Sequence, residues 1–271
     1  MGSAAAALRR RFAELHAVGT FVLPNPWDVG SARLLESLGF PALATTSSGR
    51  AAALGRLDQQ LSLDELLAHV VSLVDAVSVP VTVDAERLYA DSPEGVAETA
   101  RLIAGTGAAG FSHEDYDPLR ERLDTLPEAV ARVAAAAAVA NEHGLILTAR
   151  AENHLYGVDD LDDTIERLCA YRDAGAHAVY APGLVELEQI ARVVREVAVP
   201  VNVLALAGVP SVRELAAVGV RRVSTGGALA WAAYGAMVRA GRELLDEGTA
   251  SYVADAVPQA LRRAAFGSVQ R

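Results

Sequence analysis

The sequence predicts a closed (β/α)₈ barrel, an α/β fold, with one amphipathic helix before it and one helix after its eighth unit. Short β-branched or apolar runs alternate with helical patterns eight times within 271 residues. Glycines recur at the ends of the helical patterns, just before the next strand. Such alternation gives a parallel sheet with right-handed crossovers, and eight units in this length favour barrel closure. An open, doubly wound sheet is the alternative.

The elements follow in order along the chain. The N-terminal MGSAAAALRRRFAELHAVG is predicted to be a helix and not a signal peptide, because its arginines follow its alanines and no apolar core comes next. The strands are expected at TFVLP (20–24), PALATT (41–46), VPVTVD (79–84), AAGFSHE (108–114), LILTAR (145–150), HAVYAP (177–182), VPVNVLA (199–205) and RRVSTG (221–226). The helices are expected at 28–38, 62–77, 93–106, 125–142, 159–174, 185–197, 211–218, 227–246 and 251–266.

Helix starts and stops support this order. Ser62 and Ser92 stand at helix starts, and Pro93 takes the first helical position after Ser92. The glycines that precede strands belong at the left-handed position that ends a helix. They are Gly39, Gly107, Gly144, Gly175 and Gly219.

The composition favours one domain, residues 1–271, because 52% of the residues are hydrophobic and can fill one large core. The formal net charge of −10 gives an acidic surface that repels nucleic acid and anionic lipid, so neither partner is expected. A small anionic substrate stays compatible with this charge, because a local basic group can hold it. The single cysteine, Cys169, excludes an intrachain disulfide and fits a reducing cytoplasm. It is predicted to lie in the core.

Three carboxylates follow two neighbouring strands. Asp84 and Glu86 are two positions apart, so in extended backbone they point the same way, and Glu114 ends the next strand. At a dry barrel mouth they would repel one another, and Mg²⁺ or Mn²⁺ would relieve that repulsion. The alternative is that they cap helices and face water. His113 should point away from Glu114 and is predicted to be a packed side chain.

Other polar groups at the same edge have two interpretations each. Arg150 ends an apolar strand and needs an anion, which is either a substrate carboxylate or phosphoryl group or an internal partner, Glu152 or Glu114. The segment 45–49, TTSSG, is an anion-binding turn or an ordinary one. The pair Gly226-Gly227 opens a helix and could hold a phosphate.

With these residues in order, the sequence resembles the isocitrate lyase/phosphoenolpyruvate mutase superfamily, especially its short, phosphonomutase-like bacterial members. The sequence segments that carry the resemblance span nearly the whole barrel. They are LPNPWDVGSARLLESLGFPALATTSSG, LGRLDQQLSLDELLAHV, VPVTVDAE, LTARAEN, DLDDTIERLCAYRDAGAHAVYAPGL, VPVNVLA and GVRRVSTGGALAWAAYGA. The resemblance implies homodimers or homotetramers that exchange the eighth helix between subunits, with 251–266 as part of the exchanged element.

The resemblance also implies the chemistry. Members use Mg²⁺ to make or break C–C or P–C bonds next to a 2-oxo acid, through an enolate on the metal. By position, the implied metal acids are Asp84 and Glu86, with Glu114 acting through water. The implied catalytic residues are Asp58, in the loop after the second strand, and the anion-binding Arg150. The implied substrate-binding residues are Thr46, Ser47, Ser48, Arg150 and Asn202.

Two segments depart from the family pattern. The family has Gly-Tyr-Gly or Gly-Phe-Gly after the acids, which lets that loop approach the metal, where this chain has Arg87-Leu88-Tyr89-Ala90. The gating loop, DYDPLRERLDTL, has neither the Lys-Lys/Arg-Cys-Gly-His motif of the lyases nor the Lys-Thr-Asn segment of the mutases. A standard isocitrate or methylisocitrate lyase is therefore not expected.

The expected function is Mg²⁺-dependent C–C cleavage of a small 2-oxo or 2-hydroxy dicarboxylate, as a decarboxylase or lyase. The alternatives are P–C chemistry on phosphonopyruvate or phosphoenolpyruvate, by a mutase or hydrolase, and a non-catalytic, ligand-binding descendant.

Overall fold

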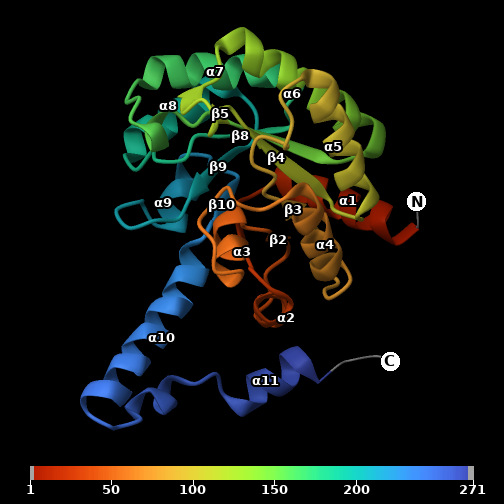
Figure 1. Ribbon diagram of the computed structural model, residues 1–271. Helices are drawn as coiled ribbons and strands as arrows, with labels where there is room; N and C mark the ends of the chain where they lie inside the picture. The colour runs from red at the N-terminus through yellow and green to blue at the C-terminus, as the bar shows by residue number, and fades with distance from the viewer. Residues whose placement is uncertain (1–2, 268–271) are drawn as a thin grey trace.

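The computed structural model describes residues 3–267, and a ring of eight parallel strands forms its centre (Figure 1). The strands are β1 Phe21–Leu23, β2 Leu43–Ala44, β3 Val81–Val83, β4 Gly110–Glu114, β7 Ile146–Arg150, β8 Ala178–Tyr180, β9 Val201–Leu204 and β10 Arg222–Ser224. Their order in the sheet is β1-β10-β9-β8-β7-β4-β3-β2, so neighbours in the chain are neighbours in the sheet. A doubly wound sheet would reverse direction midway, so the barrel prediction is confirmed.

The side chain of Asn25 helps to close the ring of strands where β1 lies next to β2. The Ala44 amide donates to the Pro24 carbonyl at 3.1 Å, and Asn25 Nδ2 donates to the Thr45 carbonyl at 2.7 Å. Asn25 Oδ1 accepts from the amides of Thr225 and Gly226, both at 2.9 Å. The carboxyl ends of the first, second and eighth barrel strands are thereby tied together.

Helices surround the barrel close to the expected positions. They are α2 Val29–Ser37, α3 Ser47–Ala53, α4 Leu63–Val74, α5 Pro93–Gly105, α6 Leu126–His143, α7 Leu161–Asp173, α8 Leu187–Val197, α9 Val212–Ala217 and α10 Ala228–Asp246. The predicted caps are confirmed, since Ser62 and Ser92 accept hydrogen bonds from the first turns of α4 and α5. The five glycines that precede strands all have positive φ.

The N-terminal helix α1, Ser3–Ala17, covers the amino-terminal end of the barrel. Phe12 packs with Phe21, Ala109 and Ile146, which lie at the starts of strands. Arg9 donates to the carbonyls of nearby residues on α5 and in the turn before β4. The barrel is therefore closed at this end.

Four local features differ from expectation. The segment 45–49 is not a free turn, because Thr46 caps α3 by accepting from the Gly49 amide at 3.2 Å. The helix expected at 251–266 is broken into a 3₁₀ turn, Ser251–Asp255, and α11, Gln259–Phe266, because Pro258 cannot continue a helix. A hairpin of β5, Tyr116–Asp117, and β6, Arg122–Leu123, and a 3₁₀ turn, η1 Asn153–Tyr156, were not expected.

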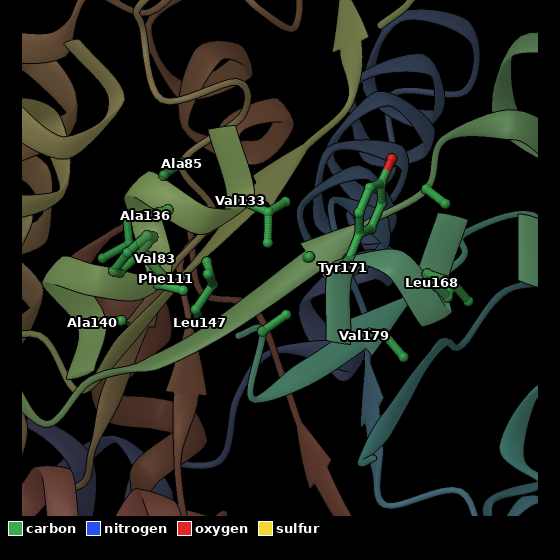
Figure 2. Packing of buried hydrophobic residues seen from close by; sticks show 14 of the residues in the cluster. Val83, Ala85, Phe111, Val133, Ala136, Ala140, Leu147, Leu168, Tyr171 and Val179 are labelled. Atoms are coloured by element: carbon green, nitrogen blue, oxygen red, sulfur yellow. The ribbon is translucent and has the colours of Figure 1, made fainter. Parts of the chain in front are cut away.

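The main core lies between the outer face of the strands and the helices. Figure 2 shows Val83, Phe111 and Leu147 of the strands against Val133, Ala136 and Ala140 of α6. The small alanines let α6 approach the barrel closely. His113 is buried on the outer face of β4, as predicted. Cys169 of α7 was predicted to lie in the core, but it is only half-buried and packs against the core from outside.

The C-terminal segment departs from the barrel. Helix α10 projects away from it, and of its residues only Ala230 is buried (Figure 1). The chain then turns back, and α11 contacts α2 of the same chain. None of the helices within residues 3–267 combines the length and the apolar character needed to cross a membrane.

Gly110→Ala is expected to destabilise the barrel by about 1–3 kcal/mol, through overpacking. A Cβ at Gly110 would lie 2.5 Å from the Ile146 carbonyl oxygen and 3.1 Å from Phe12. Urea denaturation monitored by circular dichroism measures the change. Gly105→Ala is the matched control, because a Cβ there meets nothing within 4 Å. Equal stabilities of the two variants would contradict this account of the packing at β4.

Candidate active site

Inward-facing strand residues enclose a cavity of about 180 Å³ that opens at the carboxyl ends of the strands. Because strand side chains alternate between faces, mostly every second strand residue reaches this cavity, although Thr82 and Val83 of β3 both do. The lining strand residues are Leu23, Ala44, Thr82, Val83, Ser112, Thr148, Arg150, Tyr180, Asn202, Leu204, Arg222 and Ser224, and those from the loops include Thr46, Ser47, Ser48, Asp58 and Asp84. The predicted substrate-binding residues therefore all lie on one cavity.

Arg150, the last residue of β7, is the centre of an ion cluster at the mouth. Its guanidinium contacts Asp84 Oδ1 at 3.0 Å, Glu114 Oε2 at 3.3 Å and Glu152 Oε1 at 2.7 Å. It also lies over the ring of Tyr180, 5.1 Å from the ring centroid. The internal ion pairs that the sequence left open are thus present, while Arg150 still forms part of the cavity wall.

Asp84, directly after β3, is fixed from two sides. Its Oδ2 accepts from the backbone amide and the hydroxyl of Ser47, at 2.9 and 3.0 Å. Its Oδ1 binds Arg150 and accepts from Ser112 Oγ at 3.4 Å. The start of α3 and the ends of β3 and β7 therefore hold this carboxylate at the cavity.

Glu114 and Glu152 complete the cluster from the ends of β4 and β7. Both are almost completely buried. Burial raises the pKa of Glu114 well above its ordinary value, and Arg150 opposes this shift. Burial likewise raises the pKa of Glu152. One guanidinium thus faces three carboxyl groups, so acids outnumber bases in this cluster.

Glu86 does not line this cavity, and the extended-backbone argument that paired it with Asp84 is wrong. β3 ends at Val83, and Glu86 has a left-handed φ of 48°. Its side chain lines a second cavity, of about 290 Å³, between the segment 86–91 and the β5–β6 hairpin. Its Oε1 is buried and has no hydrogen-bond partner within the described residues.

The loop that lacks the family's glycines still adopts left-handed conformations. Leu88 and Tyr89 have φ values of 60° and 51°, and Leu88 is completely buried. Arg132 of α6 holds the loop by donating to the carbonyls of Arg87, Ala90 and Asp91. Packing and hydrogen bonds from outside the loop therefore hold a conformation that glycine would adopt more readily.

Arg87 joins this loop to the hairpin of the gating segment. Its Nη2 lies 2.7 Å from Asp124 Oδ1 and 3.7 Å from Asp117 Oδ2. The hairpin also touches η1, because the rings of Tyr116 and Tyr156 stack at 3.3 Å with an interplanar angle of 9°. Three loops around the mouth are thus held together.

The acids near the mouth fit a divalent cation that keeps most of its water ligands. Within residues 3–267, no group of three or more His, Cys, Asp or Glu side chains is placed to hold a metal by itself. Mg²⁺ does not require one, since it usually keeps several waters and binds one or two carboxylates. Burial, then Asp84, then Asp58 raise the pKa of Glu86 to about 8, and a cation would relieve the repulsion among these carboxylates. The residues therefore fit Mg²⁺ bound largely through water.

The other predicted residues occupy distinct places. Asp58 lies at the exposed rim, where its Oδ1 accepts from the Gln59 amide. Ser48 Oγ, near the mouth, accepts from Trp231 Nε1 at 3.2 Å. Asn202 lies deep in the cavity, where its Oδ1 accepts from Arg222 at 2.8 Å.

Several lining residues were not singled out from the sequence. They are Ser112, Thr148, Tyr180 and Arg222. The signal for them was present, because polar residues at alternate positions of otherwise apolar barrel strands face the interior.

Comparisons with known proteins agree with this architecture. Residues 12–245 match the model of the phosphoenolpyruvate phosphomutase family. A crystal structure from Burkholderia cenocepacia J2315, assigned as a lyase or mutase, superposes with a TM-score of 0.95 at 45% identity, covering 99% of this chain and 98% of that one. The chain is 29% identical to 2-methylisocitrate lyase of Escherichia coli, over 64% of this chain and 61% of that protein. It is also 29% identical to oxaloacetate decarboxylase of Rhodopseudomonas palustris, over 65% and 62%.

Glu86→Gln is expected to flatten the dependence of stability on pH when no divalent metal is present. The pKa of Glu86 is raised from 4.5 to about 8, so the folded protein binds a proton that the unfolded chain releases. The contribution of Glu86 to the free energy of unfolding is fully present below pH 4.5 and is lost as the pH rises towards 8. The loss is on the order of a few kcal/mol.

Denaturation by urea at pH 5 and pH 8 in EDTA measures this effect. The control is Glu188→Gln, at an exposed glutamate on α8. An unchanged difference between the two pH values in Glu86→Gln would contradict the assignment.

Proposed function

The chain belongs to the phosphoenolpyruvate phosphomutase family, in the isocitrate lyase/phosphoenolpyruvate mutase superfamily, and from this premise we propose that it is a Mg²⁺-dependent enzyme that cleaves a C–C bond. The proposed substrate is a small 2-oxo or 2-hydroxy dicarboxylate, and the reaction is of decarboxylase or lyase type. The observation that carries the proposal is the Arg150 cluster, which places one cation among an excess of carboxylates at a small cavity.

Asp84 is the residue proposed to hold the cation, with Asp58, Glu86 and Glu114 acting through water. When bound, Mg²⁺ would supply positive charge that stabilises anionic oxygens of the substrate as the bond breaks. Asp84 is suited to this role because Ser47 and Arg150 already fix both of its oxygens. Its position then needs no reorganisation during the reaction.

The remaining residues would bind and orient the substrate. The hydroxyls of Ser47 and Ser48 and the guanidinium of Arg150 line the cavity beside Asp84, where they can donate to a substrate carboxylate. Glu114 is buried and its raised pKa favours the protonated form, so it can hold a proton at Oε1 or Oε2 next to the reacting end. The stacked loops above the mouth would limit access of water.

Two of the relatives are named for C–C chemistry, a 2-methylisocitrate lyase and an oxaloacetate decarboxylase, which supports this choice. P–C chemistry on phosphonopyruvate or phosphoenolpyruvate is the second candidate, because the matching family model is that of a phosphomutase. Glu86, Leu88 and Tyr89 take left-handed conformations within a loop that Arg132 holds, which argues against a dismantled site and hence against a non-catalytic descendant.

A second copy of the chain is the partner we propose for α10. Trp231, Tyr234, Val238 and Leu245 recur at helical spacing along α10, and Leu245 is 87% exposed. A helix with such a stripe that contacts little of its own barrel fits exchange between subunits.

Purified protein with Mg²⁺ is expected to bind oxalate, a mimic of an enolate, and to turn over at least one acid of a panel. The panel contains oxaloacetate, 2-methylisocitrate, dimethylmalate and phosphonopyruvate, and ³¹P NMR follows the last compound. Asp84→Asn should weaken Mg²⁺-dependent oxalate binding by at least about 100-fold, measured by calorimetry.

Asp64→Asn, at an exposed aspartate on α4, is the matched control and should bind oxalate as the parent protein does. Turnover of phosphonopyruvate alone would favour the P–C alternative. No turnover and no oxalate binding with Mg²⁺ would refute the proposed function.

Light scattering coupled to size-exclusion chromatography is expected to give a molar mass two or four times the chain mass of 28.3 kDa. Val238→Glu should shift the population towards monomer, because it places a charge in the apolar stripe. Leu57→Glu, at an exposed leucine away from α10, should not. A monomeric parent protein would rule out the exchange.

A further inference from the structure

Arg222 is a buried arginine at the floor of the cavity. It is the first residue of β10, so it lies at the end of the cavity furthest from the mouth, and it is 5% exposed. Its Nε donates to Asn202 Oδ1 at 2.8 Å, and its Nη1 lies 3.3 Å from Nε2 of His16 on α1.

None of these partners carries a negative charge. Within residues 3–267, Arg222 has no carboxylate within ion-pair distance, whereas Arg150 has three. His16 is neutral, because burial and the charge of Arg222 lower its pKa to about 3, and its Nδ1 donates to the Phe12 carbonyl. Burial lowers the pKa of Arg222 only to about 10, so Arg222 remains a cation at neutral pH.

A buried cation without an anion is unfavourable unless something supplies the missing charge. Arg222 Nη2 has no hydrogen bond to any described residue, and Arg222 lines the open cavity. Thr148 lines the same cavity, and its buried Oγ1 likewise has no partner among the described residues. Ser224 Oγ accepts from Asn202 Nδ2 at 2.8 Å, and its hydroxyl also bonds Tyr180, so it is already engaged. Two donors without a partner among the described residues, Arg222 Nη2 and Thr148 Oγ1, thus belong to residues that line this cavity, and no protein anion pairs with Arg222 there.

We propose that Arg222 forms an anion subsite that receives the second carboxylate of a dicarboxylate substrate. The inference rests on the proposed function, which places the 2-oxo or 2-hydroxy acid end at Asp84 and Arg150. The cavity is then polarised, with excess acids and a metal at the mouth and an uncompensated cation at the floor. A substrate with a terminal carboxylate would be oriented by both ends, and one with a terminal methyl group would leave Arg222 unpaired.

Calorimetric titration with malate and with 2-hydroxybutanoate tests the subsite. The two acids share the 2-hydroxy acid end and the four-carbon chain, and they differ in a terminal carboxylate or methyl group. The parent protein, with Mg²⁺, is expected to bind malate at least about tenfold more tightly, in line with a charge-assisted hydrogen bond. Arg222→Met should abolish that preference, so that malate binds no more tightly than 2-hydroxybutanoate to the variant, and Arg222→Lys should retain part of it.

Arg221→Met is the matched control, because it makes the same chemical change one residue earlier. Arg221 donates to the Gly19 carbonyl and does not line the cavity. This variant should bind both acids as the parent protein does. A crystal structure of the parent protein with malate is a readout that needs no variant, and it should place the terminal carboxylate on Arg222.

Absence of a preference for malate in the parent protein, persistence of the preference in Arg222→Met, or a terminal carboxylate bound elsewhere would each overturn the proposal. The outcome is distinguishable from failure of the proposed function. A preference for malate that depends on Arg222, without turnover of any acid, would support the subsite and refute the proposed function. Equal turnover of a dicarboxylate by the parent protein and by Arg222→Met would support the proposed function and refute the subsite.

Discussion

The arrangement of the mouth depends on one guanidinium. Arg150 reaches Asp84 after β3, Glu114 at the end of β4 and Glu152 after β7, so it fixes the relative positions of three consecutive barrel strands. Removing it would leave three carboxylates facing one another in a largely dry environment, which is far less favourable than the paired state. The same contacts position Asp84 for a cation, so the interaction that stabilises the mouth also prepares it for chemistry.

Strand alternation explains how much of this site could be predicted. The eight strands follow from apolar runs, and the carboxylates at their ends follow from where those runs stop. Two of the three partners of Arg150 were among the alternatives, because Glu152 follows the same strand and Glu114 ends the adjacent one, but the ion pair with Asp84 was not predicted. Arg222 was missed because it begins a strand instead of ending one, and residues that begin a strand lie at the floor of the barrel, away from the mouth.

The direction of Glu86 could not be predicted, for a different reason. Its backbone conformation is set by contacts far away in the sequence, above all the hydrogen bonds from Arg132 of α6 to the loop 87–91. A local rule that assumes extended backbone fails when tertiary contacts override it. The break at Pro258, by contrast, was visible in the sequence, since proline cannot occupy the interior of a helix without disrupting it.

The closure of the ring at Asn25 has a consequence for how the chain acquires its fold. Asn25 bonds a residue 20 positions ahead and others about 200 positions ahead, so it joins the start of the chain to the eighth strand. Contacts across such separations form late in folding, because the intervening chain must first be ordered. During synthesis at about 5–20 residues per second, β1 waits roughly 10–40 s for the strand that completes the ring. Until then β1 presents an unpaired edge.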